Sequence, residues 1–140
     1  MELDMARELL ETENYTCVVR QGAVCHTSRQ RGVKPLVQWL EEGLNVRGFS
    51  AADRVIGKAT AYLYVLLGVR EVYALVISRP AREVLEKNGI SCVYGRLVEN
   101  IINRKGDGIC PFEAAVMDAQ DPQDAYRAIR AKMEQMGIAL

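Results

Sequence analysis

Four residues of this chain carry side chains suited to proton transfer, charge stabilisation or nucleophilic attack: Asp53, Lys58, Cys110 and Glu113. A positioned carboxylate acts as a general acid or base, an ammonium group neutralises developing negative charge, and a thiolate attacks an electrophilic atom. The only histidine, His26, lies far from all four in the sequence. The residues therefore permit, at most, a metal-free acid/base or thiol mechanism in a shared cavity.

Asp53, Gly57 and Lys58 lie near the start of a predicted helix, and helix amino ends bind anionic groups. Ser50-Ala-Ala-Asp53 also fits a capping box, in which the serine and the carboxylate cap backbone amides without any ligand. Glycine inside a helix costs about 1 kcal/mol relative to alanine. We therefore expect another backbone or a ligand to lie close to Gly57, and both roles of Asp53 stay open.

Ser78 and Arg79 stand between an apolar run and Pro80. A cap followed by proline at the first helical position is ordinary capping chemistry. In α/β units, however, ligands bind where strands end and helices begin. This position favours a ligand-binding role for Ser78, and Arg79 is a candidate for either role.

The segment from Asn103 to Glu113 is the densest polar cluster in the chain. Cys110 precedes a helix that proline starts, where the helix dipole favours a reactive thiolate, although most reduced cysteines are small packing residues. Glu113 is either a first-turn partner of that dipole or an acid/base group. Asn103 and Arg104, in the adjoining loop, complete the predicted ligand site.

Composition and charge limit the classes of function. The 140 residues are 49% hydrophobic, and 18 basic residues balance 18 acidic ones, so we expect neither nucleic-acid nor membrane binding. No apolar run is long enough to span a bilayer, and the amino terminus resembles no signal peptide. We expect a soluble cytoplasmic protein.

The cysteines and the histidine do not suggest a metal site or another cofactor. The four cysteines include no Cys-x-x-Cys pair, which makes a zinc ribbon or a redox dithiol improbable. His26 is expected on a hairpin strand roughly opposite Cys17, and these two ligands are too few for zinc. We therefore predict reduced thiols and no cofactor.

Hydrophobic spacing and turn residues predict the elements that position these side chains. Val55, Ile56, Ala59 and Leu63 recur at helical spacing and predict a long helix. The expected helices are 4–10, 35–42, 51–67, 80–88, 110–117 and 121–137, and the expected strands are 15–19, 23–27, 72–77 and 91–94, with 97–102 extended.

This order of elements predicts one α/β domain over residues 1–140. It has three layers, α-β-α, around a mixed sheet in which an amino-terminal antiparallel hairpin joins parallel strands. The run 72–77 is almost wholly apolar and predicts a central strand covered on both faces. A strand left open at the sheet edge would allow a homodimer.

The same order resembles the cytidine-deaminase-like fold. In that superfamily, His-x-Glu opens one motif helix, Pro-Cys-x-x-Cys opens the next, and these residues build a zinc–water site. Here Asp53 lies near the first motif, and Pro80-Ala81-Arg-Glu-Val84 occupies the second. Ala81 and Val84 stand in place of the cysteines, so the resemblance implies a protein without the zinc site and without its usual deamination.

The chain more closely resembles a family of small bacterial and archaeal proteins of unknown function on this fold, which lack the zinc ligands. The shared motifs are Arg31-Gly-Val-Lys-Pro-Leu36, Ala52-Asp-Arg-Val-Ile-Gly-Lys-Ala59 and Cys110-Pro-Phe-Glu113. The resemblance covers roughly residues 14 to 118. It implies a fold but no reaction.

Two functions follow as hypotheses. The first is a small-molecule binding protein, with or without catalytic activity, whose ligand is a nucleoside, a nucleotide or another compact polar metabolite, by analogy with the fold. The second is a non-catalytic protein-interaction or regulatory module, in which the polar residues at the helix ends are caps.

Overall fold

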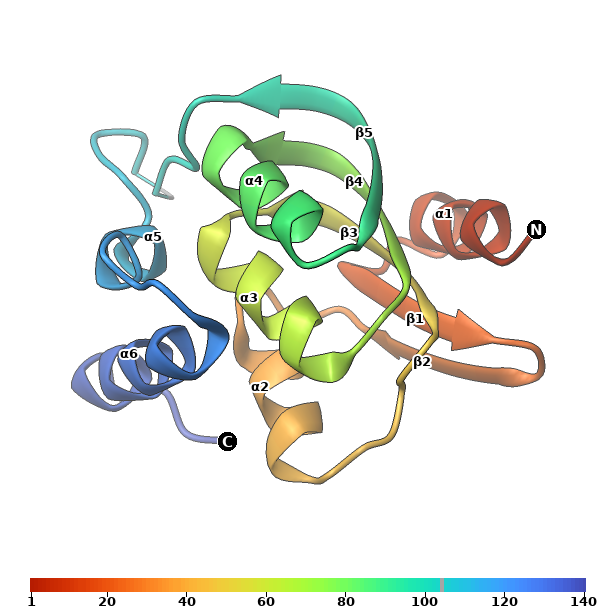
Figure 1. Cartoon of the computed structure of the whole chain (residues 1–140), viewed down its shortest axis with the longest axis horizontal. Coiled ribbons are helices and arrows are strands. Elements are labelled where there is room, and N and C mark those ends of the chain that lie inside the picture. The colour runs from red at the N-terminus through yellow and green to blue at the C-terminus, as the bar shows by residue number, and fades with distance from the viewer. Residues whose placement is uncertain (104) are drawn as a thin grey trace.

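The computed structural model describes residues 1–103 and 105–140, so the predicted ligand residue Arg104 lies outside the described residues. Helices and strands alternate along most of the chain (Figure 1). In order they are α1 (Glu2–Thr12), β1 (Cys17–Gln21), β2 (Val24–Ser28), α2 (Lys34–Glu41), β3 (Ser50–Ile56), α3 (Lys58–Leu67), β4 (Glu71–Ser78), α4 (Arg79–Lys87), β5 (Ser91–Val98), α5 (Pro111–Ala115) and α6 (Pro122–Gln135).

The five strands form one mixed sheet in the order β2-β1-β3-β4-β5. Strand β1 is antiparallel to β2 and β3, whereas β3, β4 and β5 are parallel to one another. The predicted combination of an antiparallel hairpin and parallel strands is confirmed. The hairpin register differs in one detail, because His26 lies opposite Val19 and Cys17 lies opposite Ser28.

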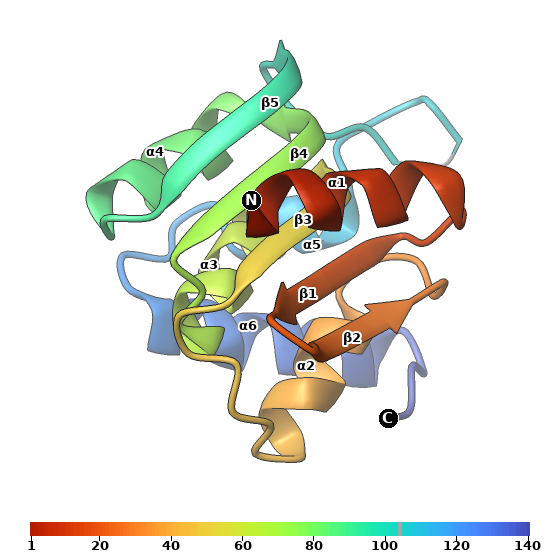
Figure 2. The same cartoon turned by 90° about the vertical axis from the view of Figure 1, so that its right-hand side faces the viewer.

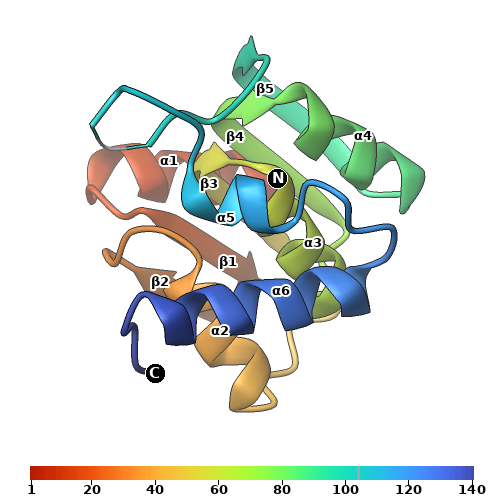
Figure 3. The same ribbon diagram turned by 90° about the vertical axis from the view of Figure 1, so that its left-hand side faces the viewer.

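Helices cover the two faces of the sheet unequally. Helix α1 lies alone on one face (Figure 2), while α2, α3 and α4 cover the other, with α5 and α6 outside α3 (Figure 3). The larger core lies between the sheet and the helices α2 to α6, and includes Leu36, Leu63 and Ile129. A smaller core lies under α1 and consists of Ala6, Leu10, Val18, Ala52 and Tyr73.

The predicted helix 51–67 is wrong in its first third. Residues Ser50–Ile56 form β3, and α3 begins at Lys58. Along β3, Ala51 faces the larger core, Ala52 faces the smaller core, and Ile56 faces the larger core again. Strict alternation would place Ala51 and Ile56 on opposite faces. The alternation of side chains between the two faces of the sheet is therefore interrupted within β3. As a result, the apolar residues of β3 have the spacing of a helix.

The neighbouring strand changes phase at the same level. In β4, Ala74 and Ile77 both contact the larger core although they are three residues apart. The row formed by Arg54, Leu75 and Gly95 is absent from both parallel pairings, while the offsets on either side of it are equal. The parallel strands therefore share one irregular row, with no extra residue in any of the three strands. Leu75 is left exposed at this row, so β4 is central but is not covered on both faces as predicted.

The other elements agree with the sequence to within a few residues. Helices α2, α4 and α6 lie where they were expected, and α1 is longer than predicted. A strand over 91–94 and a separate extended segment over 97–102 were predicted. The structure instead has one continuous strand, β5, which ends at Val98. Within the described part of the chain, no helix combines the length and the hydropathy needed to cross a bilayer.

Candidate functional site

The two predicted ligand-binding segments, at the start of α3 and at the start of α4, lie together at one end of the parallel strands. Strands β3 and β4 are parallel neighbours, so their carboxyl ends lie together. Gly57 is the N-cap residue of α3 and Ser78 is the N-cap residue of α4. Helix α5 lies beside α3 (Figure 3). This edge therefore brings together the amino ends of two long helices and the short helix that follows Cys110.

Glu113 caps the amino end of α3. Its side-chain Oε2 accepts a hydrogen bond from the backbone N–H of Ala59 at 3.0 Å, and Glu113 is only 9% exposed. A Cβ atom on Gly57 would lie 2.6 Å from the Glu113 Cδ. The φ of Gly57 is −94°, which any residue adopts, so lack of space requires the glycine. The group that approaches Gly57 closely is thus a carboxylate of the protein itself.

Lys58 makes the return contact from α3 to α5. Its Nζ donates a hydrogen bond to the carbonyl oxygen of Met117, just after α5, at 2.9 Å. The Tyr62 hydroxyl donates to the carbonyl oxygen of Ala119 at 3.1 Å. We call the contacts of Gly57, Lys58 and Ala59 with Glu113 and Met117 the α3–α5 clasp. In the clasp each helix satisfies polar groups at an end of the other.

Cys110 is the N-cap residue of α5 and lies three residues before Glu113. Its backbone N–H donates to the Ile101 carbonyl oxygen at 2.9 Å, and its side chain packs partly buried against the larger core. Among the described residues, no hydrogen bond joins its thiol to Lys58 or Glu113. No group of three or more histidine, cysteine, aspartate or glutamate side chains there is arranged to hold a metal ion.

Asp53 lies in the middle of β3 and not in a capping box. Its Oδ2 accepts a hydrogen bond from the Tyr64 hydroxyl at 2.7 Å, and its Oδ1 accepts one from the Val55 N–H at 3.2 Å. Cys17 of β1 is the residue paired with Asp53 in the sheet. Burial raises the pKa of Asp53 from 3.8 to about 7, although the hydrogen bond from Tyr64 opposes that rise. The predicted partner, Ser50, bonds to Glu71 instead.

The other predicted ligand residues have partners within the protein. The Ser78 Oγ is buried and accepts a hydrogen bond from the Ala81 N–H at 3.3 Å, which is the capping role. Arg79 forms an exposed ion pair with Glu99 at 3.0 Å. The Asn103 amide donates to Asp107 at 2.9 Å within its own loop.

A hollow of about 210 Å³ lies between α3 and α4, beside the first turns of α3 and along α4 from Pro80 to its last residue, Lys87. Among the predicted site residues that the structure describes, only Lys58 lines it. The sequence did not predict Tyr62, Glu83 or Lys87 as site residues. The usable signal was spacing, because Lys58 and Tyr62 on α3, like Glu83 and Lys87 on α4, are four residues apart and share a helix face. The lining residues are Lys58, Tyr62, Pro80, Glu83, Val84, Lys87, Ala119 and Gln120.

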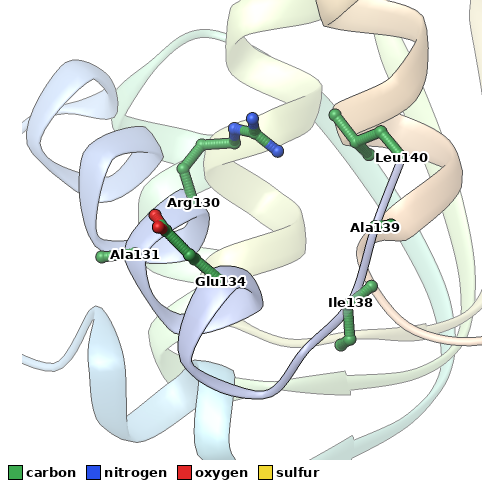
Figure 4. Close-up of a pocket in the computed structure, with 6 residues that line it drawn as sticks. All are labelled: Arg130, Ala131, Glu134, Ile138, Ala139 and Leu140. Carbon is green, nitrogen blue, oxygen red and sulfur yellow. The ribbon is translucent and has the colours of Figure 1, made fainter.

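A second hollow, of about 400 Å³, lies between the last turns of α6 and the residues that follow it (Figure 4). Its charged groups are Arg130 and Glu134, and Ile138, Ala139 and Leu140 form the opposite side. None of the predicted site residues with a described position lines it. The hollow between α3 and α4 is therefore the better candidate for the site.

The clasp predicts that Gly57 and Glu113 are energetically coupled. Gly57→Ala should destabilise the protein by about 1–3 kcal/mol because its methyl group meets the Glu113 carboxylate. Glu113→Ala should cost about 1–2 kcal/mol through loss of the cap. The double variant should be more stable than the sum of these costs implies, by about 1 kcal/mol or more. Urea unfolding of the four proteins measures this coupling.

Gly108→Ala provides a matched control. Gly108 has no positive φ, and among the described residues the atom nearest to an added Cβ, the Asn103 side-chain nitrogen, is 3.7 Å away. Its replacement should change the free energy of unfolding little. If the Gly57 and Glu113 effects simply add, or if Gly57→Ala is as mild as the control, the carboxylate does not occupy this space.

The raised pKa of Asp53 predicts that stability depends on pH. Between pH 3.8 and about 7, folded Asp53 holds its proton more tightly than unfolded Asp53, so the free energy of unfolding should fall as the pH rises through this range. Asp53→Asn should remove this fall in the free energy of unfolding. The fall amounts to a few kcal/mol at most, because the Asp53 side chain is partly exposed to solvent. Denaturant unfolding of both proteins at several pH values measures it.

Tyr64→Phe tests the cause of the shift. The tyrosine hydroxyl lowers the pKa of Asp53, so its removal should move the loss of stability to higher pH. Parallel pH profiles for wild-type protein and Asp53→Asn would contradict the assignment of this titration to Asp53.

Comparisons with known proteins place the chain in a family. The family profile described as TM1506, "Domain of unknown function (DUF1893)", matches residues 5–133, a longer span than the three motifs suggested. The chain is similar to the crystal structure of a DUF1893 family protein (TM1506) from Thermotoga maritima, with 27% sequence identity and a TM-score of 0.87 over 94% of this chain and 89% of that one. No curated protein matches the chain. The chain belongs to the DUF1893 (TM1506) family, whose function is unknown.

Proposed function

We propose that this protein binds a compact polar metabolite with an anionic group in the hollow between α3 and α4. The observation that carries the proposal is the set of charged groups in this hollow, one end of which, at Lys58 and Pro80, lies where ligands bind in α/β folds. Lys58 and Lys87 supply two ammonium groups, and Glu83 supplies one carboxylate. The excess of positive charge favours an anionic ligand, and the carboxylate can accept hydrogen bonds from a hydroxyl or amino group.

The side chains that line the hollow support a ligand with different ends. An ammonium group has three donors, and Lys58 uses one of them on the Met117 carbonyl oxygen, which leaves donors for an anion. Tyr62 contributes an aromatic ring beside Lys58. A nucleoside monophosphate has a phosphate for the lysines and hydroxyl groups for Glu83.

The size of the hollow limits the ligand. Pockets that enclose drug-sized ligands measure roughly 300–1,000 Å³, whereas this hollow measures about 210 Å³. It suits a small metabolite, or the sugar and phosphate of a nucleotide whose base lies partly outside. We therefore take nucleoside monophosphates as the first class to test, with inorganic phosphate and nucleosides as their two halves.

We further propose that the fold is cytidine-deaminase-like and that the protein works without the zinc of that superfamily. The order of elements and the mixed sheet support this assignment. Ala81 and Val84, at the positions of the expected cysteines, are buried packing residues with no atom that binds zinc. If a reaction occurs in the hollow, Lys58 would stabilise negative charge, since Asp53, Cys110 and Glu113 are not among its lining residues.

A non-catalytic interaction module is the alternative, and one observation favours it. Leu75 and Val93 lie exposed beside an open edge of the sheet, where another polypeptide could bind. This role is compatible with a ligand site, since the hollow lies on the opposite face of the sheet.

Titration with nucleoside monophosphates, followed by calorimetry and thermal unfolding, tests the proposal. We expect binding and a rise in Tm with monophosphates, and weaker binding of nucleosides or inorganic phosphate alone. Lys87→Gln should weaken monophosphate binding about tenfold, because it removes one charge-assisted hydrogen bond. Lys105→Gln, which removes the same charge from an exposed loop outside the hollow, is the control.

The proposal fails if none of these ligands binds or raises the Tm. It also fails if Lys87→Gln and Lys105→Gln weaken binding equally, since the effect would then be one of overall charge. Glu83→Gln separates the two ends of the ligand, because it should weaken nucleosides and monophosphates but leave inorganic phosphate unaffected or bound more tightly.

A further inference from the structure

We propose that Gln120 binds the anionic group of the ligand in the hollow and that Tyr62 positions Gln120 for this contact. The inference rests on the proposed function, because it names a further contact to the same ligand. It is drawn from the way in which residues 117–120, which we call the strap, are attached to α3.

The strap forms a third side of the hollow, beside α3 and α4. It leads from α5 to α6 and crosses α3 (Figure 3), and it contributes Ala119 and Gln120 to the lining. Residues 119 and 120 belong to no helix or strand. The position of Gln120 in the hollow therefore depends on the contacts that hold the strap against α3.

Two side chains of α3 hold the strap, and both donate hydrogen bonds to its backbone carbonyl oxygens. The Lys58 Nζ donates to Met117 at 2.9 Å, and the Tyr62 hydroxyl donates to Ala119 at 3.1 Å. Tyr62 is only 6% exposed, so packing fixes the position of its hydroxyl. Because Ala119 directly precedes Gln120, the Tyr62 hydroxyl determines where the Gln120 side chain begins.

The Gln120 side chain is available to a ligand. It is exposed, and its Nε2 donates only to the carbonyl oxygen of Asp118, two residues earlier, at 3.4 Å. This distance is longer than the roughly 2.7–3.2 Å of an ordinary hydrogen bond, so the contact is weak. The amide nitrogen also has a second donor. Gln120 can therefore bind a ligand with little loss of contacts inside the protein.

An anionic group bound to Lys58 lies within reach of Gln120. Lys58 is bonded to Met117, and the three residues from Met117 to Gln120 span at most about 10 Å even when extended. A glutamine side chain and a phosphate group together bridge that distance. One phosphate oxygen can accept a hydrogen bond from Lys58 and another from the Gln120 amide. Lysine binds as a point charge, whereas the amide donor adds direction, so the pair favours an oxyanion such as phosphate.

Calorimetric titration with adenosine monophosphate and with inorganic phosphate tests the contact. Gln120→Ala should weaken the binding of both about fivefold, because one hydrogen bond is lost. Gln120→Glu keeps the size of the side chain but places a carboxylate beside the anion, and it should weaken both about tenfold or more. Gln123→Glu is the matched control, because it makes the same change of charge at an exposed residue outside the lining of the hollow. Its effect should be less than about twofold.

Tyr62→Phe tests the positioning role. This variant removes only the hydroxyl that holds Ala119, and it should weaken binding of adenosine monophosphate about threefold. In a protein that already carries Gln120→Ala, it should have no further effect, because the strap no longer contacts the ligand. Full additivity of the two losses would overturn the positioning role, since the hydroxyl would then support the hollow independently of Gln120. Circular dichroism verifies that each variant folds.

The same titrations separate this inference from the proposed function. If adenosine monophosphate binds the wild-type protein and Gln120→Ala equally, or if Gln120→Glu and Gln123→Glu behave alike, the contact is overturned and the proposed function stands. A loss with adenosine monophosphate but not with inorganic phosphate would also overturn it, because Gln120 would then face another part of the ligand. If neither ligand binds the wild-type protein, the proposed function and this inference both fail.

Discussion

The buried Glu113 carboxylate at the amino end of α3 governs the arrangement of this edge of the molecule. The helix dipole and the free N–H of Ala59 favour negative charge there, and Gly57 leaves the space that the carboxylate needs. The carboxylate belongs to α5, so capping α3 also fixes α5. Lys58 then binds the chain just after α5, next to the segment whose Ala119 and Gln120 form one side of the hollow. Capping, packing and the shape of the candidate site thus depend on one contact.

This arrangement changes the roles of the residues that first suggested chemistry. Ser78 caps α4, Glu113 caps α3, and Asp53 bonds to Tyr64 within the larger core. Polar residues at helix ends are equally suited to capping and to ligand binding, because both use the same unpaired N–H groups. Charged residues one or more turns further along the helices, such as Glu83 and Lys87, have no capping role there and line the hollow.

Local signals in the sequence predicted most of the fold. The hairpin, α2, α4 and α6 have turn residues, caps and regular spacing, and the structure has them at nearly the expected positions. Strand β3 was missed because its change of phase near Arg54 gives apolar residues the spacing of a helix, and that change involves the neighbouring strands, which no local pattern records. A backbone or a ligand was predicted close to Gly57, but the neighbouring group is the side chain of Glu113, which lies 56 residues away in the sequence. The hollow was missed because it combines two helix faces whose packing depends on the whole sheet.

Hydrogen exchange at the Ala59 amide tests the central contact most directly. The account predicts that this amide, although it lies in the first turn of α3, is well protected in the wild-type protein. In Glu113→Ala, in which no carboxylate accepts its hydrogen bond, it should exchange about tenfold faster or more. Equal exchange rates in the two proteins would show that Glu113 does not hold the amino end of α3, and the account of this edge would be wrong.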